Sequence, residues 1–135
     1  MKSQNINISK ELCDEMISYH LGCLPEEGCG LLAGYDLTAR VFLPVENILH
    51  SSNRFSMKPE EQLRAFKQIE EQNMDLIAIV HSHPDGVTSP SAIDCDKFAY
   101  PGVLSVIIAA LECGAILFCY KIENKSWTSV DIEYN

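Results

Sequence analysis

Basic residues are scarce in this sequence of 135 residues, which has 10 Lys and Arg against 19 Asp and Glu and a formal net charge of -9. The phosphate backbones of nucleic acids and the anionic surfaces of membranes both repel a protein of this charge. The shortage of cations therefore argues against nucleic acid and membrane partners. It favours a neutral or basic protein surface, because such a surface is not repelled on approach.

A signal peptide, a membrane span and a cysteine pair are also missing. Residues 1–10 are polar and lack the apolar centre of a signal peptide, and the longest apolar stretch, 103–111, is too short to cross a bilayer. The 6 cysteines form no CxxC pair and lie mainly in apolar segments. These features predict a cytoplasmic protein with reduced thiols and without a structural zinc knuckle.

The residues that are present suit one folded domain. Hydrophobic residues make up 47% of the chain and charged residues 21%, which is ordinary for a globular protein and argues against a disordered chain. The length fits a single domain, and no repeat, low-complexity tract or linker divides it. We therefore expect one domain over residues 1–135.

Hydrophobic periodicity predicts a mixed α/β domain. Helical spacing indicates a helix that Ser9 caps and that ends near Leu21, a helix that begins at Pro59, and a short helix over 91–98. The run 76–83 is dense in apolar residues and should be a central strand, and Trp127 should pack in the core. This order favours a central mixed sheet flanked by helices. Apolar runs between turn signals predict strands over 29–35, 40–48, 53–57, 76–83, 102–111, 114–122 and 127–132.

The strongest chemical signal begins with His-Ser-His-Pro at residues 81–84. Side chains alternate along a strand, so His81 and His83 point to the same side and can share a metal ion. Asp94 follows Ser91 by one helical turn, which places a carboxylate at the start of a helix, facing the end of the strand. Two histidines and one carboxylate, with a water in the fourth position, form a catalytic zinc site.

These residues also have simpler explanations. Alternating histidines occur in many strands, and Ser91 with Asp94 is also a capping motif in which both side chains bind backbone N–H groups. Asp85 and Asp96 are rival third ligands. Asp85 follows Pro84 too closely to reach back easily, and Asp96 points about 200° round the helix from Asp94. The residues by themselves leave these alternatives open.

Two motifs together resemble the metal signature of the JAMM (MPN+) metallopeptidase family. The downstream run, 81–94, begins with His-Ser-His-Pro and ends with Ser-x-x-Asp. The upstream run, 25–34, reads Pro-Glu-Glu-Gly-Cys-Gly-Leu-Leu-Ala-Gly and looks like the bacterial form of the glutamate motif. The stretch 47–55 and the helix after Pro59 are also similar to small bacterial members, so the resemblance covers nearly the whole chain.

The resemblance implies a zinc metallopeptidase. It implies that Glu27, which stands two places before the Cys-Gly pair, is the general base and that the Ser91 hydroxyl stabilises the oxyanion. Without the resemblance, Glu27 is a solvated acid in a turn, like its neighbour Glu26. The resemblance also implies one zinc ion per chain and three ligands to it: His81, His83 and Asp94.

Short, stand-alone bacterial proteins of the Mec type are the JAMM members that this chain is most similar to. The resemblance implies a cytidine-deaminase-like α/β fold and hydrolysis of a peptide or isopeptide bond at the Gly-Gly C-terminus of a small ubiquitin-like or sulfur-carrier protein. Alternatives are a RadC-type protein of different activity, a non-catalytic MPN-like binding module, and a domain for cell-wall peptide processing or phage-tail assembly. The motif around Glu27 argues against the first, and the complete ligand set argues against the second.

Other candidate residues have ordinary explanations. We expect Cys29 and Cys95 to be small buried residues rather than nucleophiles. His20 and His50 have no partner pattern, which favours packing in the core or on the surface. Arg54 is the one basic residue in the stretch 47–55 and suits either a substrate tail or a surface salt bridge.

Overall fold

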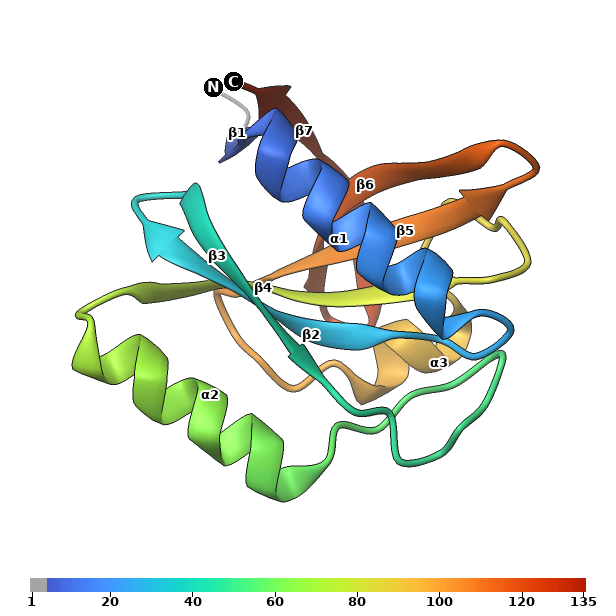
Figure 1. Ribbon diagram of the computed structural model, residues 1–135, viewed down its shortest axis with the longest axis horizontal. Helices are drawn as coiled ribbons and strands as arrows, with labels where there is room; N and C mark the ends of the chain where they lie inside the picture. Colours follow the sequence, from blue (N-terminus) through green and yellow to red (C-terminus); the bar gives the residue numbers. More distant parts are fainter. Residues whose placement is uncertain (1–4) are drawn as a thin grey trace.

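The computed structural model describes residues 5–135, and these residues form a mixed α/β fold (Figure 1). The Ser9 hydroxyl accepts a hydrogen bond from the Leu12 N–H and so begins the first helix, as predicted. Pro59 occupies the first turn of the second helix, also as predicted. In chain order the elements are β1 (Asn5–Ile8), α1 (Lys10–Cys23), β2 (Cys29–Tyr35), β3 (Thr38–Val45), α2 (Pro59–Glu71), β4 (Asp75–His83), α3 (Ala92–Lys97), β5 (Leu104–Leu111), β6 (Gly114–Glu123) and β7 (Ser126–Tyr134).

The strands form one sheet that closes on itself in the order β1-β3-β2-β4-β5-β6-β7. β4 lies between β2, which is antiparallel to it, and β5, which is parallel, so the prediction of a central strand over 76–83 is confirmed. β1 closes the sheet because it runs parallel to β7 and also meets β3 at Asn7 and Thr38. β1 was not predicted, since four residues carry too little periodicity to be recognised.

The two longer helices cover opposite faces of the sheet (Figure 1). α1 packs on one hydrophobic cluster and α2 on another. β4 supplies both clusters, because Ala78 and Val80 face the α1 side and Ile79 faces the α2 side. By the same alternation, His81 and His83 continue the face of Ile79.

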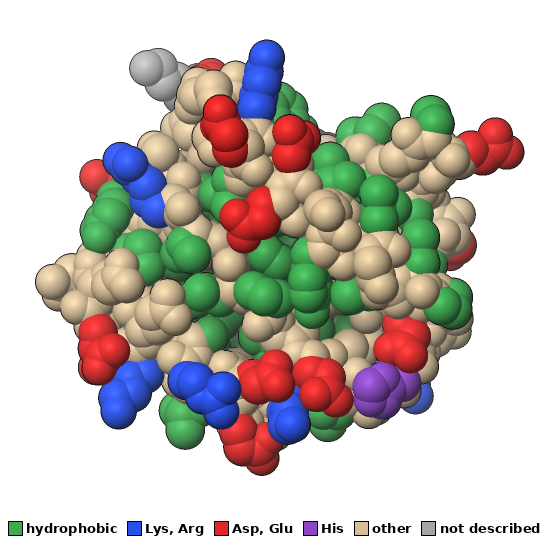
Figure 2. Space-filling view, viewed as in Figure 1, with side chains coloured by type: hydrophobic (Ala, Val, Ile, Leu, Met, Phe, Trp, Pro, Cys, Tyr) green, Lys and Arg blue, Asp and Glu red, His purple; other side chains and the backbone are tan. Residues whose placement is uncertain are grey.

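Acidic and basic side chains line the outer surface at the lower edge of the molecule, where α2 lies (Figure 2). Ala65 and Ile69 of this helix are buried, whereas Leu63 is 70% exposed. α2 is therefore an amphipathic helix with its charged side toward solvent. No helix within residues 5–135 has the length and apolar character to span a membrane.

Three details of the prediction are wrong. The segment 53–57 is not a strand, because only Met57 forms an isolated bridge, to Asn47. β3 ends at Val45 rather than at residue 48, since Asn47 turns away and its side-chain oxygen binds two backbone N–H groups of the following loop. Trp127 is 42% exposed and packs edge-on against Tyr120, so it is not a core residue.

Candidate metal centre

The end of β4 places two histidines side by side. The Nε2 atoms of His81 and His83 are 3.2 Å apart. The backbone of His81 is held on both sides, because it pairs with Cys29 on β2 and with Ile107 on β5. Both histidines are buried. The central position of the strand therefore fixes the two rings against the protein interior.

Helix α3 brings Asp94 to these histidines. The Ser91 hydroxyl accepts a hydrogen bond from the Asp94 N–H at 3.0 Å, and Asp94 Oδ2 accepts one from the Ser91 N–H at 2.9 Å. The same Oδ2 atom lies 3.2 Å from Nε2 of His81 and 3.0 Å from Nε2 of His83. The capping motif and the approach to the histidines, which the sequence left as alternatives, thus occur together.

The three donor atoms have the spacing of a tetrahedral metal site. Ligands about 2.0–2.1 Å from a zinc ion at tetrahedral angles lie roughly 3.3 Å from one another. The observed separations among His81, His83 and Asp94 are 3.2, 3.2 and 3.0 Å. Among the His, Cys, Asp and Glu side chains of residues 5–135, these three have ligand atoms that lie close enough together to hold a metal ion. The donor set therefore fits a zinc ion.

The loop after β4 sets the tautomer of His83. Nδ1 of His83 lies 2.9 Å from the Val87 carbonyl oxygen, which can only accept, so Nδ1 carries the proton. In the neutral ring, Nε2 then has a lone pair directed at the Asp94 carboxylate, an arrangement that a cation between them stabilises, whereas in the protonated ring Nε2 donates to that carboxylate. The Tyr120 hydroxyl donates to the Thr88 carbonyl and ties the same loop to β6.

Burial and hydrogen bonding act in opposite directions on the pKa values of the cluster. Burial lowers the pKa of His81 in spite of the nearby carboxylate of Asp94. Burial also acts to lower the pKa of His83, but its bonds to Asp94 and Val87 outweigh that effect and raise it. Burial alone would raise the pKa of Asp94, yet the hydrogen bonds from both histidines hold it far below its usual range. An ionised carboxylate beside a neutral imidazole is a protonation state suited to metal binding.

The ring of Phe55 stacks on His81. The ring centroids are 4.7 Å apart and the planes differ by 22°. Nδ1 of His81 has no hydrogen-bond partner among residues 5–135, so the stack and the strand backbone hold this ring in place. No sequence pattern predicts this contact of Phe55, because its neighbours in the chain form an irregular loop.

Glu27 lies buried beside the cluster. Its side chain is 3% exposed, and Oε1 has no hydrogen-bond partner among residues 5–135. Burial raises the pKa of Glu27 to about 8, with a smaller lowering by His83 and a smaller raising by Asp94. Glu27 is therefore not a solvated turn residue. Glu26 is the exposed acid of the pair, and it binds His50 on the surface at 3.0 Å.

Hydrogen bonds fix the backbone around Glu27. The Ser82 hydroxyl accepts from the Gly28 N–H at 2.8 Å, and the Asn47 amide donates to the Glu27 carbonyl at 3.0 Å. Gly28 has no space for a side chain, because an added Cβ would lie 2.8 Å from the ring of His20. No role for Ser82 or Asn47 was predicted from the sequence. Their position inside the stretches 81–94 and 47–55, which resemble the family, was the only indication of one.

The rival ligands and nucleophiles are not part of the group formed by His81, His83 and Asp94. Asp85 accepts a hydrogen bond from the backbone of its own loop, and Asp96 pairs with Lys125 at 3.1 Å. Cys29 and Cys95 are buried, and burial raises the pKa of both thiols, to about 12 for Cys29. Raised pKa values disfavour the reactive thiolate, which agrees with small packed residues rather than nucleophiles.

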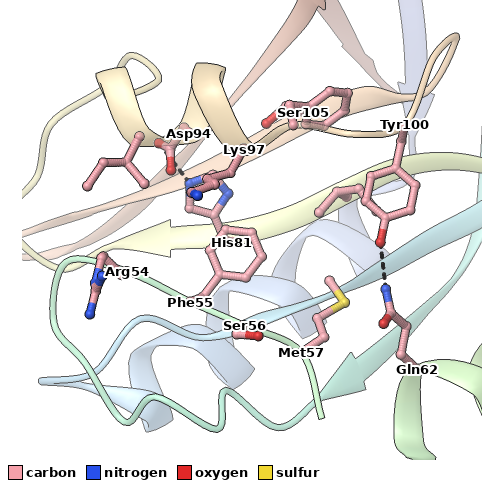
Figure 3. Close-up of a pocket in the computed structure, with 13 residues that line it drawn as sticks. Arg54, Phe55, Ser56, Met57, Gln62, His81, Asp94, Lys97, Tyr100 and Ser105 are labelled. Atoms are coloured by element: carbon pink, nitrogen blue, oxygen red, sulfur yellow. Dashed lines mark hydrogen bonds and ion pairs between the residues drawn. The ribbon is translucent and has the colours of Figure 1, made fainter. Parts of the chain in front are cut away.

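A pocket of about 250 Å³ adjoins the cluster on the side of His81 (Figure 3). The hydrogen bond from the Gln62 amide to the Tyr100 hydroxyl, 2.6 Å long, lies at the end of the pocket away from Arg54. The lining combines polar and apolar side chains and includes the candidate ligands His81 and Asp94. The apolar side chains that line it are Phe55, Met57, Ile79, Ile93 and Phe98.

Comparison with known proteins gives several relatives. Residues 9–115 match the family of prokaryotic homologues of the JAB domain. The chain is 30% identical over 115 residues to a desampylase of Haloferax volcanii, with 79% of this chain and 82% of the relative covered. It is 35% identical over 88 residues to a probable TtuB-protein conjugate cleaving protease of Thermus thermophilus, covering 64% and 59%. It is 26% identical over 107 residues to a CysO-cysteine peptidase of Mycobacterium tuberculosis, covering 78% and 73%.

Solved structures show the same fold. A protein from Desulfitobacterium hafniense aligns with a TM-score of 0.86 at 28% identity, over 96% of this chain and 92% of that one. A JAB1/MPN domain protein from Archaeoglobus fulgidus aligns with a TM-score of 0.63 at 18% identity, over 96% and 98%. The fold is thus that of JAB/MPN domains. The chain belongs to the prokaryotic JAB family. The resemblance to JAMM metallopeptidases is confirmed, and so is the prediction of a hydrolase.

Proposed function

We propose that this protein is a zinc-dependent peptidase or isopeptidase that cuts after the Gly-Gly C-terminus of a small ubiquitin-like or sulfur-carrier protein. The observation that carries the proposal is the convergence of His81, His83 and Asp94 beside the buried Glu27. Two relatives are named a probable TtuB-protein conjugate cleaving protease and a CysO-cysteine peptidase, which favours a hydrolase over a non-catalytic binding module.

One zinc ion per chain would be held by Nε2 of His81, Nε2 of His83 and Oδ2 of Asp94. Two imidazoles and one carboxylate are a ligand set typical of catalytic zinc, with a fourth position left for water. When bound, zinc polarises the scissile carbonyl and lowers the pKa of a ligated water to about 7. The hydrogen bonds that His83 makes to Val87 and that Asp94 makes to Ser91 would hold these ligands in orientation.

Glu27 would transfer the proton. In its ionised form, which a cation at the neighbouring ligands would favour, Glu27 would accept a proton from the attacking water while the water oxygen bonds to the carbonyl carbon. The carboxyl then returns that proton to the amine nitrogen as the carbon–nitrogen bond breaks. The buried position and the unpaired Oε1 atom support this role, because a carboxylate without a protein partner is free to bind the water.

Ser91 would stabilise the oxyanion of the tetrahedral intermediate. Its oxygen already accepts the hydrogen bond from the Asp94 N–H, so its own hydrogen remains free to donate. A donor aimed at the developing negative charge contributes more in the transition state than in the ground state. The same hydroxyl can therefore serve the helix cap and the reaction.

A carrier tail that ends in two glycines suits the approach to this cluster. Phe55 and Ile93 line the pocket together with His81 and Asp94. A substrate tail beside these bulky side chains would be least crowded at glycine, which has no side chain. We therefore infer a preference for Gly-Gly over bulkier residues at the cut.

We propose that residues 1–135 act as a single JAMM/MPN+ domain with a cytidine-deaminase-like layout, in the cytoplasm. The pairing of β1 with β7 supports one domain, since it joins the two ends of the described chain. The partner would be the carrier protein, with no nucleic acid or membrane involved.

Two carrier substrates test the function. One is a β-grasp protein extended beyond Gly-Gly by a short peptide, and the other is the same protein joined through Gly-Gly to a lysine side chain. Mass spectrometry should show cleavage after the second glycine, loss of cleavage with a chelator, and recovery with zinc. A carrier with Leu-Leu in place of Gly-Gly is the matched control. Equal cleavage of both tails would contradict the preference, and the faster of the two bonds identifies peptidase or isopeptidase activity.

A further inference from the structure

The position of Glu27 indicates on which side of the candidate site the leaving amine lies. In the antiparallel pair of β2 and β4, Cys29 pairs with His81 and the Ser82 N–H donates to the Gly28 carbonyl, so Glu27, one residue further back along the chain, lies opposite His83. Glu27 therefore sits on the His83 side of the cluster. A group that returns a proton to the leaving amine must lie beside that amine. The acyl half of the substrate, which is the carrier tail, then extends past His81.

The pocket lies on this acyl side. It is lined by His81 and Asp94 but not by Glu27 or His83. A tail that leaves the cluster past His81 therefore enters the pocket that Figure 3 shows, in the direction of Tyr100. Its first residue with a side chain is the one that precedes the two glycines.

Two cations without partners line the pocket. Lys97 and Arg54 contribute to the lining, yet neither takes part in an ion pair within residues 5–135. Asp96, the acid next to Lys97 in the chain, is bound to Lys125 instead. These two cations face the single carboxylate of Asp94 in the lining, so the charge of the pocket is positive on balance in a chain with a net charge of -9.

The spacing of α3 relates Lys97 to a particular tail residue. Lys97 follows Asp94 by three residues, so it lies on the same side of the helix and roughly 4.5 Å further along its axis. An extended tail advances about 3.4 Å per residue, which puts the residue before Gly-Gly roughly 7 Å from the scissile carbonyl. The lysine side chain is long enough to cover the difference between these two distances, because its aliphatic part can bend along the apolar wall of the pocket.

We propose that this pocket selects carrier tails with an acidic residue immediately before Gly-Gly, and that Lys97 binds its carboxylate. This inference rests on the proposed function. Arg54 stands at the opposite end of the pocket from Tyr100, so it adds a weaker and less specific attraction (Figure 3). The walls formed by Met57 and Phe98 contact the aliphatic part of the same side chain.

Short fluorogenic peptides that differ only before Gly-Gly test the selection. Wild-type protein loaded with zinc should cleave Glu-Gly-Gly faster than Gln-Gly-Gly, and Gln-Gly-Gly faster than Lys-Gly-Gly, with a difference in kcat/KM of about fivefold between the extremes. The ratio should shrink as salt is raised. Lys97→Glu should reverse the order. Lys67→Glu makes the same change of charge on the exposed side of α2 and should leave the order as in wild type.

Equal rates for the three peptides, or an unchanged order in Lys97→Glu, would overturn the inference while leaving the proposed function intact. A binding measurement tests the charge selection independently of the proposed function. Glu27→Gln cannot transfer the proton but keeps the pocket, so fluorescence anisotropy can compare labelled Glu-Gly-Gly and Lys-Gly-Gly tails without turnover. Tighter binding of the acidic tail with no cleavage of any peptide by wild type would reject the proposed function and support the charge selection. Equal binding of the two tails would reject the selection itself.

Discussion

Ser82 and Gly28 bind each other through two hydrogen bonds: the Ser82 hydroxyl accepts from the Gly28 N–H at 2.8 Å, and the Ser82 N–H donates to the Gly28 carbonyl at 3.1 Å. Ser82 stands between the two histidines of β4, and Gly28 follows Glu27. The pair therefore fixes the acid relative to the candidate ligands. Because the contact spans 54 positions of sequence, it is made only when β2 and β4 are aligned.

Ser82→Ala should slow turnover without removing zinc. The substitution leaves the buried Gly28 N–H without its partner, at a cost of about 1–3 kcal/mol of stability. A displaced Glu27 lowers kcat by up to about 10²-fold, while KM changes little. Combining Ser82→Ala with Glu27→Gln should give no further loss of rate, because Ser82 acts through Glu27. Additive losses in the double variant, measured by single-turnover kinetics, would show that Ser82 has a separate effect.

His83→Ala should remove most of the metal. It deletes one of three donors whose mutual separations fit zinc. Protein purified without added metal should contain close to one zinc ion per chain by elemental analysis, and the variant should contain far less. His50→Ala is the matched control, because that histidine lies on the surface beside Glu26. Full zinc retention in His83→Ala would remove it from the ligand set.

Ser91 has two tasks that two substitutions can separate. Ser91→Ala should lose about 1 kcal/mol of stability with the cap and about 10²–10³ in rate with the oxyanion donor. Ser91→Asp keeps a capping acceptor but has no hydrogen to donate at neutral pH. It should recover the melting temperature and remain slow. Recovery of both stability and rate in Ser91→Asp would leave only the capping role.

Local patterns predicted most elements of the fold because they depend on neighbours in the chain. The bounds of β2 agree with the prediction, and the starts of α1 and α2 follow from Ser9 and Pro59. The segment 53–57 misled because Phe55 and Met57 alternate as in a strand, although Phe55 stacks on His81 and Met57 forms only an isolated bridge. Neither contact is visible in the spacing.

The residues of the candidate site also differ in whether local patterns predict them. His81, His83 and Asp94 were predicted from strand alternation and one helical turn, and the structure brings them together. Glu27 could be singled out from Glu26 only through the family resemblance, because nothing local predicts that it is buried. The contact of Ser82 with Gly28 depends on strand register, which single-residue patterns do not specify.

His20 should make the protein sensitive to acid. It is 1% exposed, and burial lowers its pKa from 6.5 to about 4, against a smaller raising by its bond to the Met16 carbonyl. The unfolded chain therefore takes up the proton first, and stability is lost as pH falls from about 6.5 towards 4. The advantage of wild type over His20→Gln in free energy of unfolding should shrink by up to about 3 kcal/mol across this range.

Urea titrations at several pH values measure that advantage. The candidate zinc ligands also gain protons in acid, but they are the same in both proteins and cancel in the comparison. His50→Gln makes the same change of residue type at the surface and controls for the substitution itself. A constant difference between wild type and His20→Gln from pH 7 to 4 would contradict a neutral buried His20.

Glu27→Gln is the sharpest test of the proposed mechanism. Glutamine keeps the shape of the side chain but cannot accept a proton from water, so the rate should fall by about 10²–10⁴-fold. Zinc content should stay at the wild-type level, since Glu27 is not among the three atoms that converge on the metal position. Stability should not decrease, because burial already raises the pKa of this carboxyl to about 8 and disfavours its charge.

Glu26→Gln is the matched control one residue away. Its carboxylate is 41% exposed and binds His50 on the surface, so its loss should leave both rate and zinc unchanged. Loss of zinc in Glu27→Gln would make Glu27 a ligand and would require a different coordination set. Full activity in both variants would contradict proton transfer by Glu27 and with it the hydrolytic mechanism, because Glu27 is the acid that the fold buries beside His83 and Asp94.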